Sequence, residues 1–106
     1  MASDKSFADY ILEQIQDAGE VSSIKMFGEY GVYCDGKIVA LVCDNQFYVK
    51  PTGGGRSFIG NPVEAAPYPG AKPYFLIKEN LEDPDWMSEL IKITANELPV
   101  SKKKRK

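Results

Sequence analysis

Two tight-turn signals bracket a short apolar run near the middle of the sequence, and they constrain the fold more than any other feature. Asp35-Gly36 is a dipeptide that two-residue β-hairpin turns prefer, and Asp44-Asn45 is a second turn pair. The run between them is apolar at positions that would face both sides of a sheet, which is typical of a central strand. We therefore predict a three-stranded antiparallel meander whose strands are residues 25–34, 37–43 and 46–50.

Amphipathic helices are predicted on both sides of this meander. Apolar residues recur at helical spacing over residues 5–18 and again over residues 84–98, where Asp83-Pro84 is a typical helix start. A short apolar strand, residues 74–78, precedes the second helix. Strands that group together indicate an α+β fold, in which an antiparallel sheet (the meander plus at least one later strand) packs against an N-terminal and a C-terminal helix.

Residues 51–73 form an irregular insertion with five prolines and five glycines. An unstructured loop of this length is uncommon in a compact domain, so we predict a short helix from about Gly54 to Ile59, with Thr52 as its cap. No linker interrupts the chain before its C-terminal end. We expect one domain over residues 1–100 and a disordered basic tail over residues 101–106.

Charge and composition exclude several classes of function. The 106 residues include no histidine, which removes Ser-His-Asp and Cys-His catalysis and every histidine metal site. Five of the 13 basic residues are in the tail, so the rest of the chain holds 8 basic against 15 acidic residues. A fold that binds DNA would carry a basic stripe on its body. We expect no catalytic residues, no cofactor and no metal.

The chain has no apolar run long enough to cross a membrane and no signal-peptide segment at its N-terminus, so we expect a cytoplasmic protein. Its two cysteines, Cys34 and Cys43, are not expected to pair. The hairpin places Cys34 opposite Lys37, and Cys43 is then six residues further along, roughly 20 Å at the usual strand rise. A disulfide needs Cα atoms within about 7 Å, so we predict two reduced, part-buried thiols.

The insertion at residues 51–73 offers the candidate partner surface. Tyrosine and arginine are enriched at interface hot spots, and prolines lower the entropy lost when a partner fixes a loop. The candidates are Arg56, Phe58, Ile59 and Tyr68. Two alternatives stay open: the apolar residues fold back and close one edge of the core, or Arg56, Tyr68 and Lys72 form a small-ligand or enzymatic site.

The tail is the clearest electrostatic feature of the sequence. Five positive charges could release counterions from nucleic acid, which would give weak, salt-sensitive binding without sequence specificity. The alternative is a solvated tail that aids solubility. The residues concerned are Lys102, Lys103, Lys104, Arg105 and Lys106.

One segment resembles a known family. Residues 26–33 (MFGEYGVY) resemble the opening of the N-terminal domain of TfoX/Sxy, the bacterial regulators of competence genes. Gly28 and Gly31 within it also fit a bulge or a close approach of another group. The resemblance extends over residues 5–99, through Asp35-Gly36, the strand Phe47–Lys50, the segment Tyr68–Tyr74 and the helix Trp86–Pro99.

The resemblance implies a small α+β domain of helices on an antiparallel sheet, in proteins that act as regulators and adaptors, and it brings no catalytic residue set. Larger members carry a second, helical C-terminal domain, and this chain would be a stand-alone N-terminal domain. We therefore expect a non-enzymatic regulatory domain with an unknown protein partner, such as a transcription regulator. Nucleic-acid binding through the tail and a ligand site at the insertion are the alternatives.

Overall fold

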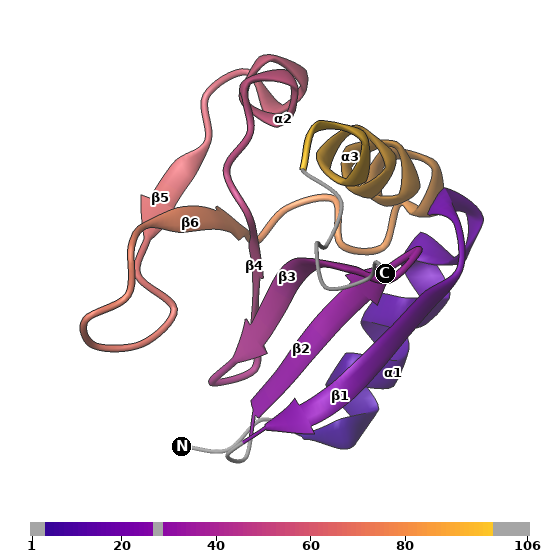
Figure 1. Ribbon diagram of the computed structural model, residues 1–106, viewed down its shortest axis with the longest axis vertical. Coiled ribbons are helices and arrows are strands. Elements are labelled where there is room, and N and C mark those ends of the chain that lie inside the picture. Colours follow the sequence, from indigo (N-terminus) through magenta and orange to yellow (C-terminus); the bar gives the residue numbers. More distant parts are fainter. Residues whose placement is uncertain (1–3, 27–28, 99–106) are drawn as a thin grey trace, which may run out of the picture.

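The computed structural model describes residues 4–26 and 29–98, which form a six-stranded antiparallel sheet with three α-helices (Figure 1). The predicted α+β fold is confirmed. In chain order the elements are α1 (Lys5–Ile15), the 3-10 helix η1 (Gln16–Ala18), β1 (Val21–Met26), β2 (Glu29–Cys34), β3 (Lys37–Cys43), β4 (Gln46–Val49), α2 (Gly53–Ile59), β5 (Val63–Ala65), β6 (Tyr74–Ile77) and α3 (Pro84–Glu97).

The strands lie in the order β1-β2-β3-β4-β6-β5, so that β1 and β5 are the two edges. The meander has one strand more than the sequence predicted. The single predicted strand 25–34 is wrong, because the chain reverses after Met26 and this residue pairs with Glu29. The first strand of the pair was missed because its sequence, VSSIKM, is half polar, as an edge strand can be. Phe27 and Gly28, which join the two strands, lie outside the described residues.

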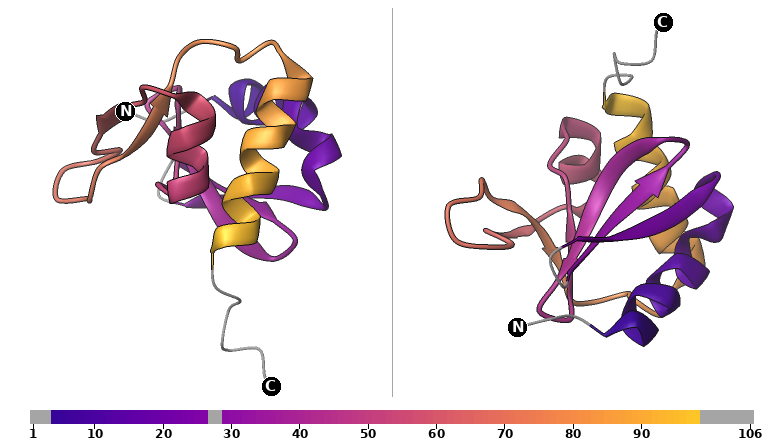
Figure 2. Two further views of the ribbon diagram at one scale, coloured as in Figure 1. Left: turned by 90° about the horizontal axis from the view of Figure 1, so that it is seen from above. Right: turned by 60° about the horizontal axis from the view of Figure 1, so that its bottom comes forward.

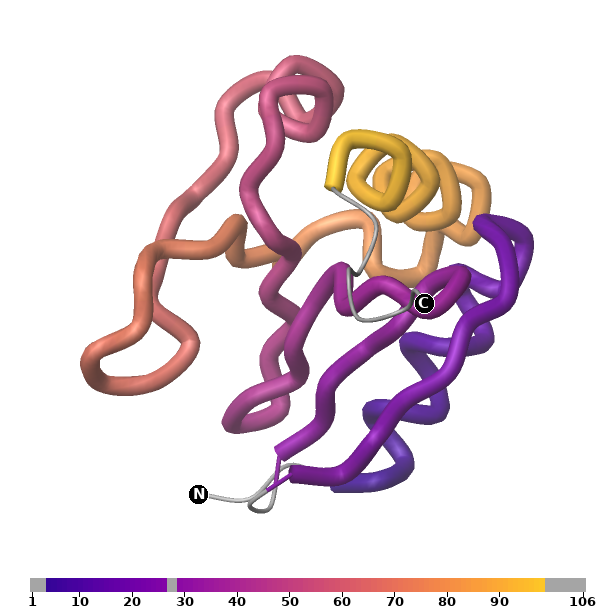
Figure 3. The backbone as a smooth tube through the Cα atoms, in the orientation of Figure 1, coloured from indigo at the N-terminus to yellow at the C-terminus, as the bar shows by residue number. Residues whose placement is uncertain are grey.

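The insertion contains the predicted short helix, α2. Thr52 is its N-cap, as predicted: the Thr52 Oγ1 accepts a hydrogen bond of 3.0 Å from the backbone N–H of Gly55. The insertion also contains β5, which pairs with β6 and which the sequence analysis missed. Three residues are too few to show the alternation of a strand. The connection between these two strands extends away from the helices (Figure 3).

The core lies between one face of the sheet and helices α1 and α3, with α2 beside α3 (Figure 2). Asp83 caps α3 by accepting a hydrogen bond of 3.2 Å from the N–H of Trp86, and Pro84 follows in the first turn, as the sequence indicated. Lys37 closes the other end of α3, because its Nζ donates to the carbonyls of Ala95 at 2.8 Å and Leu98 at 3.2 Å. The largest fully buried side chains are Phe47, Phe75, Ile11, Ile15, Met87, Leu90, Ile91, Val32, Val39, Val42, Val49 and Thr94.

Candidate functional site

The cross-strand register sorts the strand residues into two faces. Paired residues carry their side chains on the same face, and the faces alternate along each strand. One row of paired residues lies in the core and is fully buried: Val32, Ala40, Val49 and Phe75. A second row of paired residues, shifted from the first by one residue along each strand, crosses all six strands on the opposite face. This apolar row consists of Ile24, Gly31, Leu41, Tyr48, Leu76 and Val63.

The apolar row is not covered by the helices. Among the described residues, the core cluster and the side chains packed against it include no member of the row. The row ends at both edges of the sheet in exposed side chains, since Ile24 is 51% and Val63 is 60% exposed. The remaining large apolar side chain that is exposed in the described part of the chain is Tyr68, at 56%, in the connection between β5 and β6.

Further apolar side chains widen the row around Gly31. A Cβ atom on this glycine would lie 2.5 Å from the Cε of Met26, 3.3 Å from the Cδ1 of Ile38 and 3.5 Å from the Cε1 of Tyr33. These three side chains therefore close over Gly31, which confirms the predicted close approach. We use the name open face for the surface formed by the apolar row together with Met26, Tyr33, Ile38, Cys43 and Tyr74.

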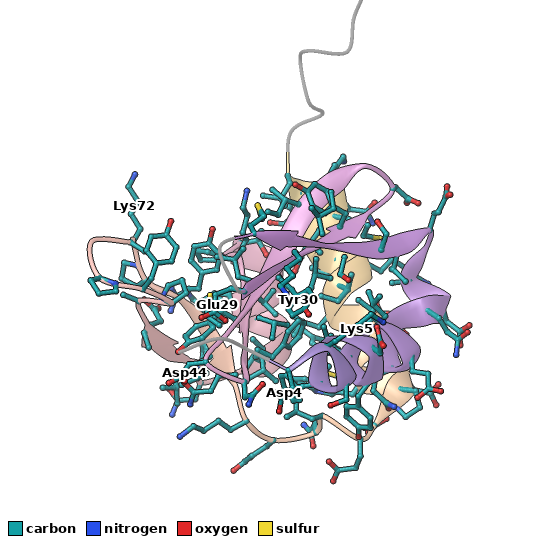
Figure 4. All side chains as sticks on the ribbon, turned by 90° about the horizontal axis from the view of Figure 1, so that it is seen from below. Asp4, Lys5, Glu29, Tyr30, Asp44 and Lys72 are labelled. Atoms are coloured by element: carbon teal, nitrogen blue, oxygen red, sulfur yellow. The ribbon has the colours of Figure 1, made fainter. Side chains whose placement is uncertain are left out.

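The open face is almost free of charge. Within the described strands, its register positions include one charged residue, Glu29, whose Oε1 accepts a hydrogen bond of 3.0 Å from the N–H of Asp44 (Figure 4). Elsewhere the surface is acidic. All 15 acidic residues but only 8 of the 13 basic ones lie in the described part of the chain, a net charge of −7.

Three titratable side chains of the open face, Cys43, Tyr48 and Tyr74, stay neutral at neutral pH. Burial, with the nearby charges of Glu29 and Asp44, raises the pKa of the Cys43 thiol to about 11. Burial also raises the pKa of Tyr48, whose hydroxyl donates to the Oε1 of Gln46 at 2.9 Å, and the pKa of Tyr74. This face therefore offers apolar contact and hydroxyl groups rather than charge.

Both cysteines are free, as predicted, and Cys34 lies opposite Lys37 as expected. Both are buried, whereas the prediction was part-buried thiols. Cys34 belongs to the covered face, where its Sγ contacts the carbonyl of Ala18 at 3.8 Å and burial raises the pKa of the thiol. Neither thiol has the lowered pKa of a nucleophilic cysteine.

The four residues of the predicted partner surface differ in their contacts and burial. Arg56 pairs with Glu64 at 2.6 Å, and its guanidinium carbon lies 5.2 Å from the centre of the Phe75 ring. Phe58 is half-buried with its ring centre 5.4 Å from that of Trp86, and Ile59 also packs against the core. These two residues close an edge of the core, which was the alternative. Tyr68 remains exposed.

The residues of the predicted ligand site do not line a cleft that the described residues form. The Arg56 guanidinium is held by Glu64, whereas Lys72 is exposed and points outward from the connection between β5 and β6 (Figure 4). A cleft of about 430 Å³ lies elsewhere, where α2, β5, β6 and the start of α3 meet. It includes none of Arg56, Tyr68 and Lys72, and no pattern in the sequence indicated it. Its lining includes Ile59, Pro62, Val63, Leu76, Lys78 and Trp86.

The proposed nucleic-acid tail, Lys102 to Lys106, lies outside the described residues. Tail binding therefore stays a prediction. Within the described residues, no helix is both long enough and apolar enough to cross a membrane.

Comparison with known proteins gives the family. The family model of the TfoX N-terminal domain matches residues 13–97. The chain belongs to the TfoX N-terminal domain family. The resemblance seen in the sequence is thereby confirmed. A relative with 39% identity over 105 residues, 99% of this chain and 91% of its own length, is an uncharacterized 12.7 kDa protein in the trpE 5′ region of Spirochaeta aurantia.

The segment that suggested the TfoX N-terminal domain contributes to both faces of the sheet. Tyr30 and Val32 are buried in the core, whereas Met26, Gly31 and Tyr33 belong to the open face. The sequence analysis did not identify the open face. The signal was the apolar content of β3 on both sides, which does not show whether both sides are covered.

Proposed function

We propose that this TfoX N-terminal domain is a non-enzymatic regulatory domain that acts by binding another protein through its open face. The apolar row carries this proposal, because it crosses the whole sheet and both of its ends are exposed. Between these ends Leu41 and Leu76 are partly exposed, whereas Gly31 and Tyr48 are buried. Exposed apolar side chains on a sheet face that no helix covers mark a candidate interaction site. Family membership supports the regulatory role, and competence genes are the targets that the family suggests.

The composition of the open face suits protein binding. Tyrosine is enriched at interface hot spots, and the face contains Tyr33, Tyr48 and Tyr74. Completing the burial of a half-exposed aliphatic side chain contributes about 1 kcal/mol, so Ile24 and Val63 together contribute about 2 kcal/mol, and the more buried Leu41 and Leu76 contribute less each. Association itself costs at least about 4 kcal/mol, so a partner must cover the tyrosines as well as the row.

Nucleic acid suits this surface less well. The open face has no basic residue within the described strands, and the net charge of −7 over the described residues repels phosphate. Binding would depend on the tail alone. Deleting residues 102–106 should then abolish it, and unchanged binding after this deletion would contradict the tail mechanism.

Protein binding through the open face can be tested with matched baits in a lysate of the source cells. The open-face variant, Ile24→Lys/Val63→Lys, places lysines at the two exposed ends of the apolar row. The control variant, Ser57→Lys/Asn96→Lys, places lysines at two exposed positions on the helices. Both variants gain two positive charges. We expect the wild type and the control to retain the same partner and the open-face variant to lose it. Equal retention by all three baits would contradict the proposed site.

The regulatory role has a separate readout. Deleting the gene should change transcript levels of competence genes, and the control variant should restore them while the open-face variant should not. Unchanged transcripts after deletion would contradict the competence role.

A further inference from the structure

We propose that the open face binds a second copy of this chain, so that two sheets pack face to face about a two-fold axis. This inference rests on the proposed function, because it names the second copy as one protein that the open face binds. Three observations carry it: the distribution of charge, the match between the two halves of the apolar row, and the size of the face.

Charge restricts where two identical copies can meet. The exposed charged residues of α1 and η1 are Lys5, Asp9, Glu13 and Asp17, and those of α3 are Asp85, Glu89, Lys92 and Glu97, so each surface has a net charge of −2. Contacts through the helices would bring these acidic surfaces together, and like charges across an interface cost several kcal/mol. The open face has only Glu29 as a charged residue within the described strands, so two copies can approach there without that cost.

The apolar row is self-complementary about an axis that runs along the strands between β3 and β4. The strand order places β1 and β5 at equal distances on either side of this axis, and likewise β2 and β6. The axis therefore brings Ile24 over Val63 of the second copy and Leu41 over Tyr48 of the second copy. The two most exposed positions of the row cover each other, which an interface with the same patch on both subunits requires.

The ends of neighbouring strands match in charge under the same axis. Glu29 begins β2, and Lys78 directly follows β6 on the same face. Since β2 and β6 exchange places about the axis, Glu29 approaches Lys78 of the second copy. This ion pair would lie at the rim of the interface. It would help to fix how the two sheets align and would add little to the affinity of the dimer.

The size of the face predicts a weak dimer. With strands roughly 4.8 Å apart and same-face residues roughly 6.8 Å apart, three such residues on each of β1, β2 and β3 and two on each of β4, β5 and β6 span an area of roughly 500 Å². Two copies would bury roughly 1,000 Å², which is below the range of stable specific interfaces and within that of weak, transient ones. The dimer should therefore exchange with monomer over the micromolar concentration range, and another partner bound through the open face would replace the second copy.

Sedimentation equilibrium of the full chain from about 1 µM to about 1 mM tests the inference, since these concentrations span the weak affinities expected for an interface of this size. We expect a monomer–dimer equilibrium that Ile24→Lys/Val63→Lys weakens at least about tenfold, because lysines would be buried without partners. The control Ser57→Lys/Asn96→Lys should leave it unchanged. Both substituted open-face positions are exposed in the monomer, so we expect the variants to fold. Circular dichroism of each variant checks this.

A charge-swapped variant tests the two-fold axis. In Ile24→Lys/Val63→Glu the two substituted positions face each other across the axis with opposite charge, so dimerisation should recover relative to Ile24→Lys alone. A monomer throughout the concentration range, or equal dimerisation of the wild type and Ile24→Lys/Val63→Lys, would overturn the inference.

The bait experiment separates this inference from the proposed function. If the chain is monomeric and the open-face bait still loses its partner, the dimer is wrong and the proposed function stands. If the dimer is lost in the open-face variant but partner capture is unchanged, the dimer stands and the proposed binding site for the partner is wrong.

Discussion

The two faces of the sheet are built from the same strands and are both apolar, yet they have opposite fates. On β6, Phe75 is fully buried under the helices, whereas its neighbour Leu76 belongs to the open face and remains partly exposed. Both faces also have a tyrosine-containing row across the central strands. An apolar face is thus necessary for a core, but only the placement of the helices decides which face becomes one.

The largest expected effect comes from comparing the same substitution on the two faces. Ile77→Ala removes a side chain that is 5% exposed on the covered face and should lower the free energy of unfolding by about 2–5 kcal/mol. Ile24→Ala, at a position that is 51% exposed on the open face, should change it by less than about 0.5 kcal/mol. Urea unfolding at low protein concentration measures both. Equal losses would show that the open face is also covered.

Lys37 should show the next largest effect. Its Nζ donates to the last carbonyls of α3, so Lys37→Met leaves these partly buried acceptors without their charged donor. We expect a loss of about 1–3 kcal/mol in unfolding free energy. Lys72→Met, in the exposed connection between β5 and β6, is the control and should be nearly neutral. Similar stabilities of the two variants would contradict the capping role.

High pH should weaken the fold. The pKa of Cys43 is raised by burial from 9.0 to about 11 in the folded chain, so the unfolded chain releases this proton first as the pH rises. The stabilisation is complete below pH 9 and declines towards pH 11. Tyr48 and Tyr74 act in the same direction, since burial raises the pKa of each.

Urea midpoints between pH 8 and pH 10.5 test this expectation, and Cys43→Ala should lessen the decline above pH 9. The matched variant on the covered face is Cys34→Ala, whose thiol pKa is also raised. Stability that stays constant or rises above pH 9 would contradict the assigned burial of these groups.

The smallest effect concerns packing within the open face. In Gly31→Ala the new methyl group would displace the end of the Met26 side chain, which lies 2.5 Å from the ideal Cβ position. Because a methionine side chain adapts easily, the cost should be about 1 kcal/mol or less. Adding Met26→Ala should remove most of this cost. No recovery in the double variant would mean that Met26 does not lie over Gly31.

The elements that sequence reasoning predicted well have strong local signals. The turns at Asp35-Gly36 and Asp44-Asn45 use left-handed backbone at Asp35, Gly36, Asp44 and Asn45, which these residue types tolerate. The caps Thr52 and Asp83 were identified because their side chains act on nearby backbone. Local chemistry of this kind is readable without knowledge of the tertiary structure.

The parts that were missed depend on tertiary contacts. β5 is a strand only because β6 pairs with it, and Lys37 caps a helix that begins 47 residues later in the chain. The open face could not be predicted for the same reason. Both sides of β3 are apolar in sequence, and only the positions of α1 and α3 reveal which side is left uncovered.

The inferred dimer requires that two copies of this domain meet through the open face and not through the helical surface. A dilution series of methyl NMR spectra distinguishes the two surfaces, because methyl groups mark both faces of the sheet. We expect concentration-dependent shifts at Ile24, Leu41, Val63 and Leu76 and constant shifts at Ile11, Leu90 and Ile91. Shifts confined to the α1 and α3 methyl groups, or no concentration dependence up to about 1 mM, the upper end of weak association, would contradict it.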